Sequence, residues 1–255
     1  MRQICKIVKK EFLTPDIVDL RFYSQEIAAA CFPGQFVHIL CSPAQVLRRP
    51  ISICDVEGGA VRVLFEVRGG GTEYLSRLEP GDAIDVLGPV GNGFSDVPRG
   101  ERALFVGGGI GIFPLLMPAR RCDKTPSVIL GFRDISRVVL VDDFRKLSCN
   151  LSVMSDNGSF GERGFVTDKM AEILRRGEAD RVYACGPKAM LKAVAELAAQ
   201  YSLPCEVSME ERMGCGIGAC LVCACAVRRA NGERDYVHVC KDGPVFDASE
   251  VDFDA

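Results

Sequence analysis

The sequence predicts a multidomain α+β protein in three parts: an antiparallel β-barrel domain over residues 1–98, an α/β domain with a parallel sheet over 99–206, and a small cysteine-rich module over 207–255. Short strand-like runs separated by Gly/Pro turns fill the first part. Strand-like and helical segments alternate in the second part. The third part carries closely spaced cysteines, and a module this small usually needs a metal or other cross-link to be stable. The length of 255 residues is enough for two compact domains and one appendage.

The first part reads as a series of short strands. These runs are rich in β-branched and aromatic residues that partly alternate with polar ones, and turns such as Pro33-Gly34 separate them. Charges interrupt every apolar stretch of the N-terminal segment, so we expect a strand there and no signal peptide. The predicted strands include residues 1–11, 17–23, 35–40 and 61–67. One short helix is predicted over residues 72–78.

The second part changes to strands that alternate with helices, which is typical of a parallel α/β sheet. Pro187 suits the first turn of a helix because its missing N–H is unpaired there anyway. The predicted strands are residues 103–106, 127–130, 151–154 and 181–184, and the predicted helices are 168–176 and 187–200.

Four cysteines near the C-terminus form the most specific pattern in the chain. Their C-x4-C-x2-C spacing with a distant fourth member is the plant-type arrangement for a [2Fe–2S] cluster. The predicted ligands are Cys215, Cys220, Cys223 and Cys240. Intervening glycines let a loop wrap around a cluster and turn N–H groups toward its sulfurs. A structural zinc site and disulfides remain as alternatives, and Cys225 is expected to be a packed bystander at the start of a strand.

Composition excludes several classes of function. Thirteen cysteines are an odd number and lie scattered along the chain, which favours a reducing cytoplasm over a secreted disulfide scaffold. A net charge of −3 without a long basic run predicts no nucleic-acid partner. The longest uncharged segment, residues 103–119, is interrupted by Gly and Pro and is short for a membrane span. His38 and His238 lie in no nucleophile or metal pattern and are expected to be structural, and no catalytic acid or base is predicted.

Two turns of the α/β domain are candidate nucleotide-binding segments. Gly107–Gly111 directly follows an apolar strand, where backbone amides can approach a phosphate, although the spacing is not the Rossmann pattern and a merely tight turn is the alternative. Cys185-Gly186-Pro187 follows a second strand. Because ligands of open α/β sheets bind at the carboxyl ends of strands, both turns could face one crevice.

A candidate dinucleotide site also lies in the first domain. Arg49 and Ser52 place a guanidinium and a hydroxyl on one extended segment, and Gly71-Thr72 opens the predicted short helix. An Arg can grip a phosphate with paired hydrogen bonds, and a glycine turn offers N–H donors to another phosphate oxygen. The alternative is a surface Arg pair beside an ordinary hairpin.

The order of these motifs resembles a known family. R-P-x-S at 49–52, Gly71-Thr72, G-G-G-I-G at 107–111 and C-G-P-x-x-M at 185–190 together resemble the ferredoxin–NADP reductase superfamily of flavoproteins. With the cysteine module appended, and above all residues 210–220, the chain is most similar to the electron-transfer subunits of bacterial dihydroorotate dehydrogenase B.

The resemblance implies two cofactor sites and one co-substrate site. FAD would contact Arg49, Pro50, Ile51, Ser52, Leu64, Phe65, Glu66, Gly71 and Thr72. NAD would contact Gly107, Gly108, Gly109, Ile110, Gly111, Cys185, Gly186 and Pro187, with residues 156–159 and 164–168 beside it. Cys185 would lie where nicotinamide meets flavin, or would be one more small buried residue. Arg133 and Arg137 lie near where a 2′-phosphate would be gripped, so NAD rather than NADP follows from the resemblance alone.

The resemblance also implies a partner and a route for electrons. A separate FMN-containing catalytic subunit would oxidise dihydroorotate to orotate in pyrimidine biosynthesis. Electrons would then pass through the [2Fe–2S] cluster and FAD to NAD⁺, in a heterotetramer of two copies of each subunit. The alternatives are the flavin/[2Fe–2S] subunit of an electron-bifurcating ferredoxin:NADP oxidoreductase or of a sulfide dehydrogenase, relatives that can carry Asp where this sequence has Cys215, and a non-enzymatic redox-sensing regulator.

Overall fold

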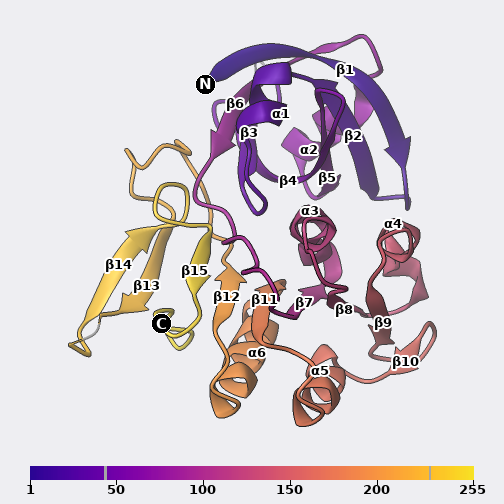
Figure 1. Cartoon of the computed structure of the whole chain (residues 1–255). Coiled ribbons are helices and arrows are strands. Elements are labelled where there is room, and N and C mark those ends of the chain that lie inside the picture. Colours follow the sequence, from indigo (N-terminus) through magenta and orange to yellow (C-terminus); the bar gives the residue numbers. More distant parts are fainter. Residues whose placement is uncertain (43–44, 230) are drawn as a thin grey trace.

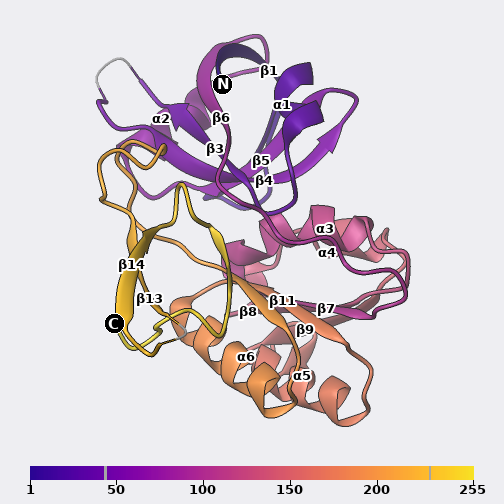
Figure 2. The same ribbon diagram turned by 60° about the vertical axis from the view of Figure 1, so that its left-hand side comes forward.

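The computed structural model describes residues 1–42, 45–229 and 231–255. A β-barrel lies above an α/β domain, and the C-terminal segment runs along one side of both (Figure 1). The same arrangement is visible after a 60° turn, where the C-terminal hairpin lies beside the helices of the α/β domain and the loop that precedes β13 (Ala224–Arg228) reaches the barrel (Figure 2). The predicted fold class is confirmed.

The first domain is a closed antiparallel barrel with strand order β1-β2-β5-β4-β3-β6. Its strands are β1 (Arg2–Phe12), β2 (Ile17–Tyr23), β3 (Phe36–Leu40), β4 (Arg49–Glu57), β5 (Ala60–Glu66) and β6 (Ala83–Val90). β1 pairs with β2 at one end and with β6 at the other, which closes the sheet and removes its free edges. Two helices, α1 (Gln25–Ala30) and α2 (Gly70–Arg77), accompany the barrel.

The second domain is a seven-stranded sheet of order β10-β9-β8-β7-β11-β12-β15. Its strands are β7 (Ala103–Gly108), β8 (Ser127–Phe132), β9 (Asn150–Ser155), β10 (Glu162–Arg163), β11 (Arg181–Cys185), β12 (Cys205–Ser208) and β15 (Val245–Asp247). All neighbours are parallel except β15, which pairs antiparallel with β12. Helices α5 (Val166–Arg175) and α6 (Lys188–Gln200) lie on the face away from the barrel (Figure 1).

The other face of this sheet meets the barrel through a 3₁₀ helix, η1 (Gly109–Leu115), and the short helix α3 (Leu116–Arg120), both of which contact β4. A second 3₁₀ helix, η2 (Ile135–Arg137), and α4 (Val141–Arg145) follow β8. In the register of β7 and β11, Gly107 stands opposite Cys185. The two turns predicted to face one crevice are therefore adjacent.

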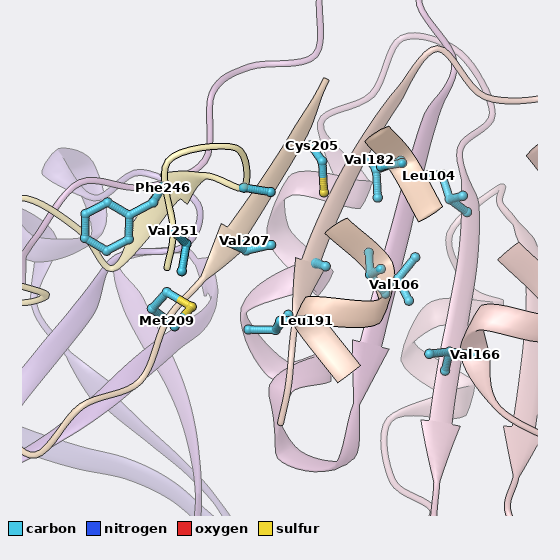
Figure 3. Close-up of a cluster of buried hydrophobic side chains, with 14 of the residues drawn as sticks. Leu104, Val106, Val166, Val182, Leu191, Cys205, Val207, Met209, Phe246 and Val251 are labelled. Carbon is cyan, nitrogen blue, oxygen red and sulfur yellow. The ribbon is translucent and has the colours of Figure 1, made fainter. Parts of the chain in front are cut away.

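The cysteine module is built from a loop, a hairpin and one added strand. β13 (Ala224–Arg228) and β14 (Arg234–His238) form the hairpin, while β15 extends the sheet of the α/β domain. Phe246 and Val251 of the module share a buried cluster with Val207 and Leu191 (Figure 3). This shared core fixes the module against the sheet because separating the two would expose apolar surface.

Most predicted elements are confirmed within one or two residues. The elements β6, β10, β12, β14, β15, α1 and α4 were not predicted, and β4 was predicted only as an extended segment around Arg49 and Ser52. The segment after Gly107–Gly111, expected to be helical, begins as a 3₁₀ helix containing Pro114. No helix in the described part of the chain has the length and apolar character needed to cross a bilayer.

Candidate flavin, nucleotide and iron–sulfur sites

A cavity of about 460 Å³ lies between the barrel and the α/β domain. The barrel contributes the start of β4, the end of β5 and the start of α2 to its walls. The α/β domain contributes the turns at the ends of β7 and β11. Of the predicted contacts, it brings together Arg49, Pro50, Ile51, Ser52, Leu64, Phe65, Glu66, Thr72, Ile110, Gly111 and Cys185. Residues predicted for FAD and residues predicted for NAD thus meet in one cavity.

Arg49 and α2 form the polar end of this cavity. A Cβ on Gly71 would lie 2.7 Å from Arg49 Nε, so only glycine leaves room for the guanidinium beside the helix. Gly71 supports Arg49 in this way and is not itself part of the cavity lining. Arg49 donates from Nη1 to the Leu47 carbonyl at 2.7 Å, which holds its head group at the cavity. A guanidinium beside a glycine turn fits a diphosphate, and the apolar walls suit a flat ring system.

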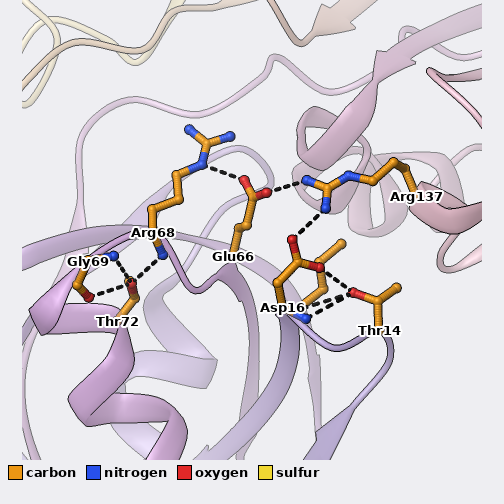
Figure 4. Close-up of polar contacts among 8 residues, drawn as sticks. Thr14, Asp16, Glu66, Arg68, Gly69, Thr72 and Arg137 are labelled. Atoms are coloured by element: carbon orange, nitrogen blue, oxygen red, sulfur yellow. Dashed lines mark hydrogen bonds and ion pairs between the residues drawn. The ribbon is translucent and has the colours of Figure 1, made fainter.

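Thr72 has a local structural role in the same turn. Its Oγ1 accepts from the backbone N–H of Arg68 at 2.9 Å and of Gly69 at 3.3 Å, and it donates to the Gly69 carbonyl at 3.1 Å. These contacts satisfy backbone groups at the N-terminus of α2 (Figure 4). The hydroxyl therefore shapes the turn that faces the cavity.

Glu66 links the two domains while it lines the cavity. Its carboxylate accepts from Arg68 of the barrel and from Arg137 of η2 in the α/β domain (Figure 4). Arg137 also donates from Nη1 to Asp16 Oδ2 at 2.5 Å. Arg137, one of two candidates for a 2′-phosphate, is thereby placed at the domain interface.

A second cavity of about 510 Å³ opens at the carboxyl ends of β7, β8 and β9. Its walls include the other part of the predicted nucleotide residues, among them Gly108, Gly109, Pro187, Arg133, Asp156 and residues 164–167. Gly109 has φ +57° and no atom near its Cβ position, so its backbone is open toward the cavity. Backbone N–H groups with this access, at a strand-to-helix turn, fit a nucleotide phosphate.

Four of the predicted glycines are closely packed, and one of them, Gly108, also lines the second cavity: a Cβ there would lie 2.5 Å from Met190 Sδ. A Cβ on Gly107 would lie 2.8 Å from Ile112 Cγ2, and one on Gly111 would lie 2.5 Å from the Cys185 carbonyl oxygen. A Cβ on Gly186 would lie 2.6 Å from Met190 Cε. Gly107 and Gly186 line neither cavity and instead let the two turns approach each other.

Cys185 faces the first cavity as a neutral thiol. Its side chain is 2% exposed. Burial, aided by the nearby Glu210 carboxylate, raises the pKa of Cys185 to about 12. Burial also raises the pKa of Glu210, which lines the same cavity, while Arg68 partly opposes that shift.

The four predicted cluster cysteines come together as two pairs. Cys215 lies beside Cys220, and Cys223 lies beside Cys240. Among the described residues, no three His, Cys, Asp or Glu side chains converge as ligands of one ion. Two pairs of thiols match a binuclear cluster, in which each iron takes two cysteines. All thirteen cysteines are free thiols in this structure, which therefore contains no disulfide.

The loop around these cysteines directs backbone N–H groups at their sulfurs. The donors, with N–S distances, are Cys215 to Cys220 (3.3 Å), Ile217 to Cys215 (3.4 Å), Ala219 to Cys215 (3.2 Å), Gly218 to Cys240 (3.1 Å) and Cys240 to Cys223 (3.4 Å). Burial alone would raise the pKa of Cys215, but the N–H groups of Ile217, Cys220 and Ala219 and the Cys220 side chain outweigh it and lower the pKa to about 6. Burial and the neighbouring Cys223 raise the pKa of Cys240 to about 12, although the Gly218 N–H opposes that shift. N–H groups directed at the sulfurs fit an anionic iron–sulfur cluster.

His38 lies directly under this loop. It is 0% exposed on β3, and a Cβ on Gly216 would lie 2.3 Å from its Nδ1. Burial, with the nearby Arg48 charge, lowers the pKa of His38 to about 4. The imidazole is therefore neutral at physiological pH. Cys225, by contrast, is buried in β13, consistent with its expected role as a packed bystander.

The first cavity also has walls that sequence reasoning did not single out. They come from β3, from η1 and from the segment that leads into the cysteine loop: Phe36, Phe113, Pro114, Ser208, Met209, Glu210, Glu211, Met213 and Pro244. The stretch 210–220 was noted for its resemblance, but its contact with the cavity depends on the chain path after β12.

Family models match two of the three parts. The iron–sulfur cluster binding domain of dihydroorotate dehydrogenase B matches residues 210–252, and an oxidoreductase NAD-binding domain matches residues 105–196. Together with flavoprotein structural neighbours, they support FAD, a [2Fe–2S] cluster and NAD as the groups this chain works with.

Whole-chain relatives point the same way. The chain is 46% identical to a dihydroorotate dehydrogenase B (NAD(+)) electron transfer subunit of Caldanaerobacter subterraneus subsp. tengcongensis, with 87% of each chain covered. It is 44% identical to the subunit of that name in Bacillus caldolyticus, with 86% of each covered. A solved NADH-dependent reduced ferredoxin-NADP oxidoreductase, studied for flavin-based electron bifurcation, superposes with a TM-score of 0.87 at 34% identity, covering 99% of this chain and 91% of that one. By sequence identity over most of its length, the chain belongs to the family of dihydroorotate dehydrogenase B (NAD(+)) electron transfer subunits.

Proposed function

We propose that this chain passes electrons from the FMN of a dihydroorotate-oxidising catalytic subunit to NAD⁺, as the electron-transfer subunit of that enzyme. It is an NAD-linked flavin/iron–sulfur oxidoreductase subunit, and the oxidation of dihydroorotate itself belongs to the partner. When bound, FAD would supply the conversion between one-electron exchange with the cluster and hydride exchange with the nicotinamide.

One observation carries the proposal: a single cavity touches all three parts of the chain. Its lining includes Arg49 and Pro50 from the barrel and Gly111 from the α/β domain. It also includes Met213 from the segment that precedes the cysteines. Only Gly214 separates Met213 from the first ligand, Cys215. A flavin in this cavity would therefore lie beside both the nucleotide turn and the cluster loop.

The protein residues bind and orient, and none needs to transfer a proton. Arg49 would hold the FAD diphosphate, and the apolar residues Ile51 and Leu64 would position its ring. The backbone of Gly108–Gly109 and the β8–β9 edge would hold the nicotinamide nucleotide. The buried thiol of Cys185 fills the meeting point without adding charge, which agrees with proximity and no acid–base role.

The exposed rim of the cysteine loop offers a place for electrons to enter. Cys220 is exposed, and Ile217, Leu221 and Val222 beside it are 61%, 61% and 55% exposed. Apolar side chains grouped on a surface mark protein contact sites. We propose that the FMN-containing subunit docks on this rim, in a heterotetramer of two plus two subunits.

Two further parts of the proposal rest on the sequence. The free thiols of the described cysteines suit the reducing cytoplasm as the working compartment. The division into an FAD-binding domain at 1–98, an NAD-binding domain at 99–206 and a cluster module at 207–255 is proposed from the change of pattern along the chain.

The bifurcating alternative shares the fold but is less well supported. The solved relative of that kind is 34% identical, below the 46% and 44% of the dihydroorotate dehydrogenase subunits. Cys215 is also present here, where the resembled bifurcating proteins can carry Asp.

The test is anaerobic purification of the native complex, mass spectrometry of the partner and an assay for dihydroorotate-dependent NAD⁺ reduction. We expect an FMN-containing partner and that activity, whereas the chain alone should reduce an artificial acceptor with NADH and leave dihydroorotate unoxidised. Leu221→Glu should weaken the complex, while Val8→Glu, at a 48% exposed site on β1, should not. A partner active with ferredoxin or sulfide would contradict the proposal.

A further inference from the structure

His38 is a buried polar side chain that no function described so far uses. It lies on β3, is 0% exposed, and neither ring nitrogen has a hydrogen-bond partner among the described residues. Buried polar groups are normally paired, because an unpaired one loses its hydrogen bonds to water without replacement. A side chain in this state needs a structural reason.

The cysteine loop supplies the nearest candidate. Gly216 is buried and has φ +71°, and a Cβ there would lie 2.3 Å from His38 Nδ1 and 3.0 Å from Cε1. The backbone of the loop thus rests on the edge of the imidazole.

The other side of His38 leads to the flavin cavity. His38 stands opposite Pro50 in the register of β3 and β4, and Pro50 lines that cavity. Arg48 donates from Nη1 to the His38 carbonyl at 3.2 Å, which fixes the backbone of this residue. His38 therefore stands between a cluster ligand and the cavity wall.

We propose that His38 is a positioning residue for electron transfer: its Nδ1 lies against the backbone at Gly216, and through this polar contact the ring holds the cluster loop against the barrel. The inference rests on the proposed function, because it assumes a cluster in the loop and a flavin in the cavity. Groups that contact metal ligands from outside orient them and tune the metal.

The first test uses the intact chain loaded with FAD and cluster. His38→Leu removes both ring nitrogens, and His38→Gln keeps a donor. We expect His38→Leu to change the EPR spectrum and midpoint potential of the reduced cluster and to slow flavin-to-cluster electron transfer about tenfold. Reduction of the flavin by NADH should stay within twofold, and His38→Gln should retain most of the wild-type behaviour. An unchanged spectrum and transfer rate in His38→Leu would overturn the proposal.

Two glycines provide a matched control if His38→Leu fails to hold its cluster. Gly216 and Gly232 both have positive φ, +71° and +83°, but only Gly216 has an atom near its Cβ position. Gly216→Ala should disturb the cluster spectrum more than Gly232→Ala, and adding His38→Ala should relieve the clash and move the spectrum back toward that of His38→Ala alone. Equal effects of the two glycine variants would contradict the contact. A wild-type chain that binds neither FAD nor cluster would overturn the proposed function instead.

Discussion

Asp16 and Arg137 form an ion pair 2.5 Å long across the boundary between the barrel and the α/β domain. The same guanidinium also reaches Glu66 in the wall of the flavin cavity. A hydrogen bond from the Thr14 hydroxyl lowers the pKa of Asp16 most, and the hydrogen bond from Arg137 lowers it further. One arginine therefore ties together the domains that share the cavity.

Removing this arginine should loosen the interface. The side chains of Asp16 and Arg137 are 38% and 33% exposed, so solvent screening limits the loss for Arg137→Gln to about 1 kcal/mol of unfolding free energy. FAD should also dissociate faster, because Glu66 loses its partner in the other domain. Urea unfolding and flavin fluorescence measure both effects. Arg145→Gln, which breaks the exposed pair with Asp142 on α4, is the control and should leave both unchanged.

Arg49 should contribute strongly to FAD affinity. A hydrogen bond to a charged group is worth roughly 2 kcal/mol, so Arg49→Ala should weaken FAD binding about 30-fold. Titration of the apoprotein with FAD provides the measurement. Arg77→Ala removes a 73% exposed arginine from the end of α2 and serves as the comparison. Equal affinities for the two variants would contradict the assignment of Arg49.

The cluster should depend on its four ligands and not on Cys225. Cys220→Ser should abolish the visible absorbance and EPR signal of a [2Fe–2S] cluster, while NADH still reduces the bound flavin. Cys225→Ser changes a buried thiol only two residues from Cys223 and should keep the cluster. Iron and zinc analysis of the purified chain separates the cluster from the zinc alternative, and one zinc without iron would refute the cluster.

The pair of Arg102 and Asp180 should make stability depend on pH. Hydrogen bonds from the Arg102 side chain and backbone N–H lower the pKa of Asp180 to about 2. A carboxyl group with a lowered pKa stabilises the fold above its unfolded pKa of about 4 and loses that contribution as the pH falls toward 2. The pair is over one third exposed, so we expect Asp180→Asn to cost about 1 kcal/mol. Urea unfolding should give a constant penalty between pH 5 and 8 that shrinks below pH 4.

Local patterns were enough to predict much of the fold. Residues 17–23 and the apolar runs at 103–106 and 181–184 appear as strands, and each is buried over most of its length, as short runs rich in apolar residues predict. The edge strand β15 was not predictable, because its three residues gain their structure only by pairing with β12, about 40 residues earlier.

The cysteine spacing by itself predicted a [2Fe–2S] cluster and left zinc as an alternative, because ligand number and spacing are local properties. The turns at Gly107–Gly111 and Cys185–Pro187 were likewise visible as motifs. Only the tertiary structure decided that Gly107 and Gly186 line neither cavity while Gly108 and Gly109 line one, and that Arg137 bridges domains. It also placed His38 beneath Gly216, 178 positions later. Contacts of this kind depend on how separate elements dock, and docking is set by packing over the whole molecule.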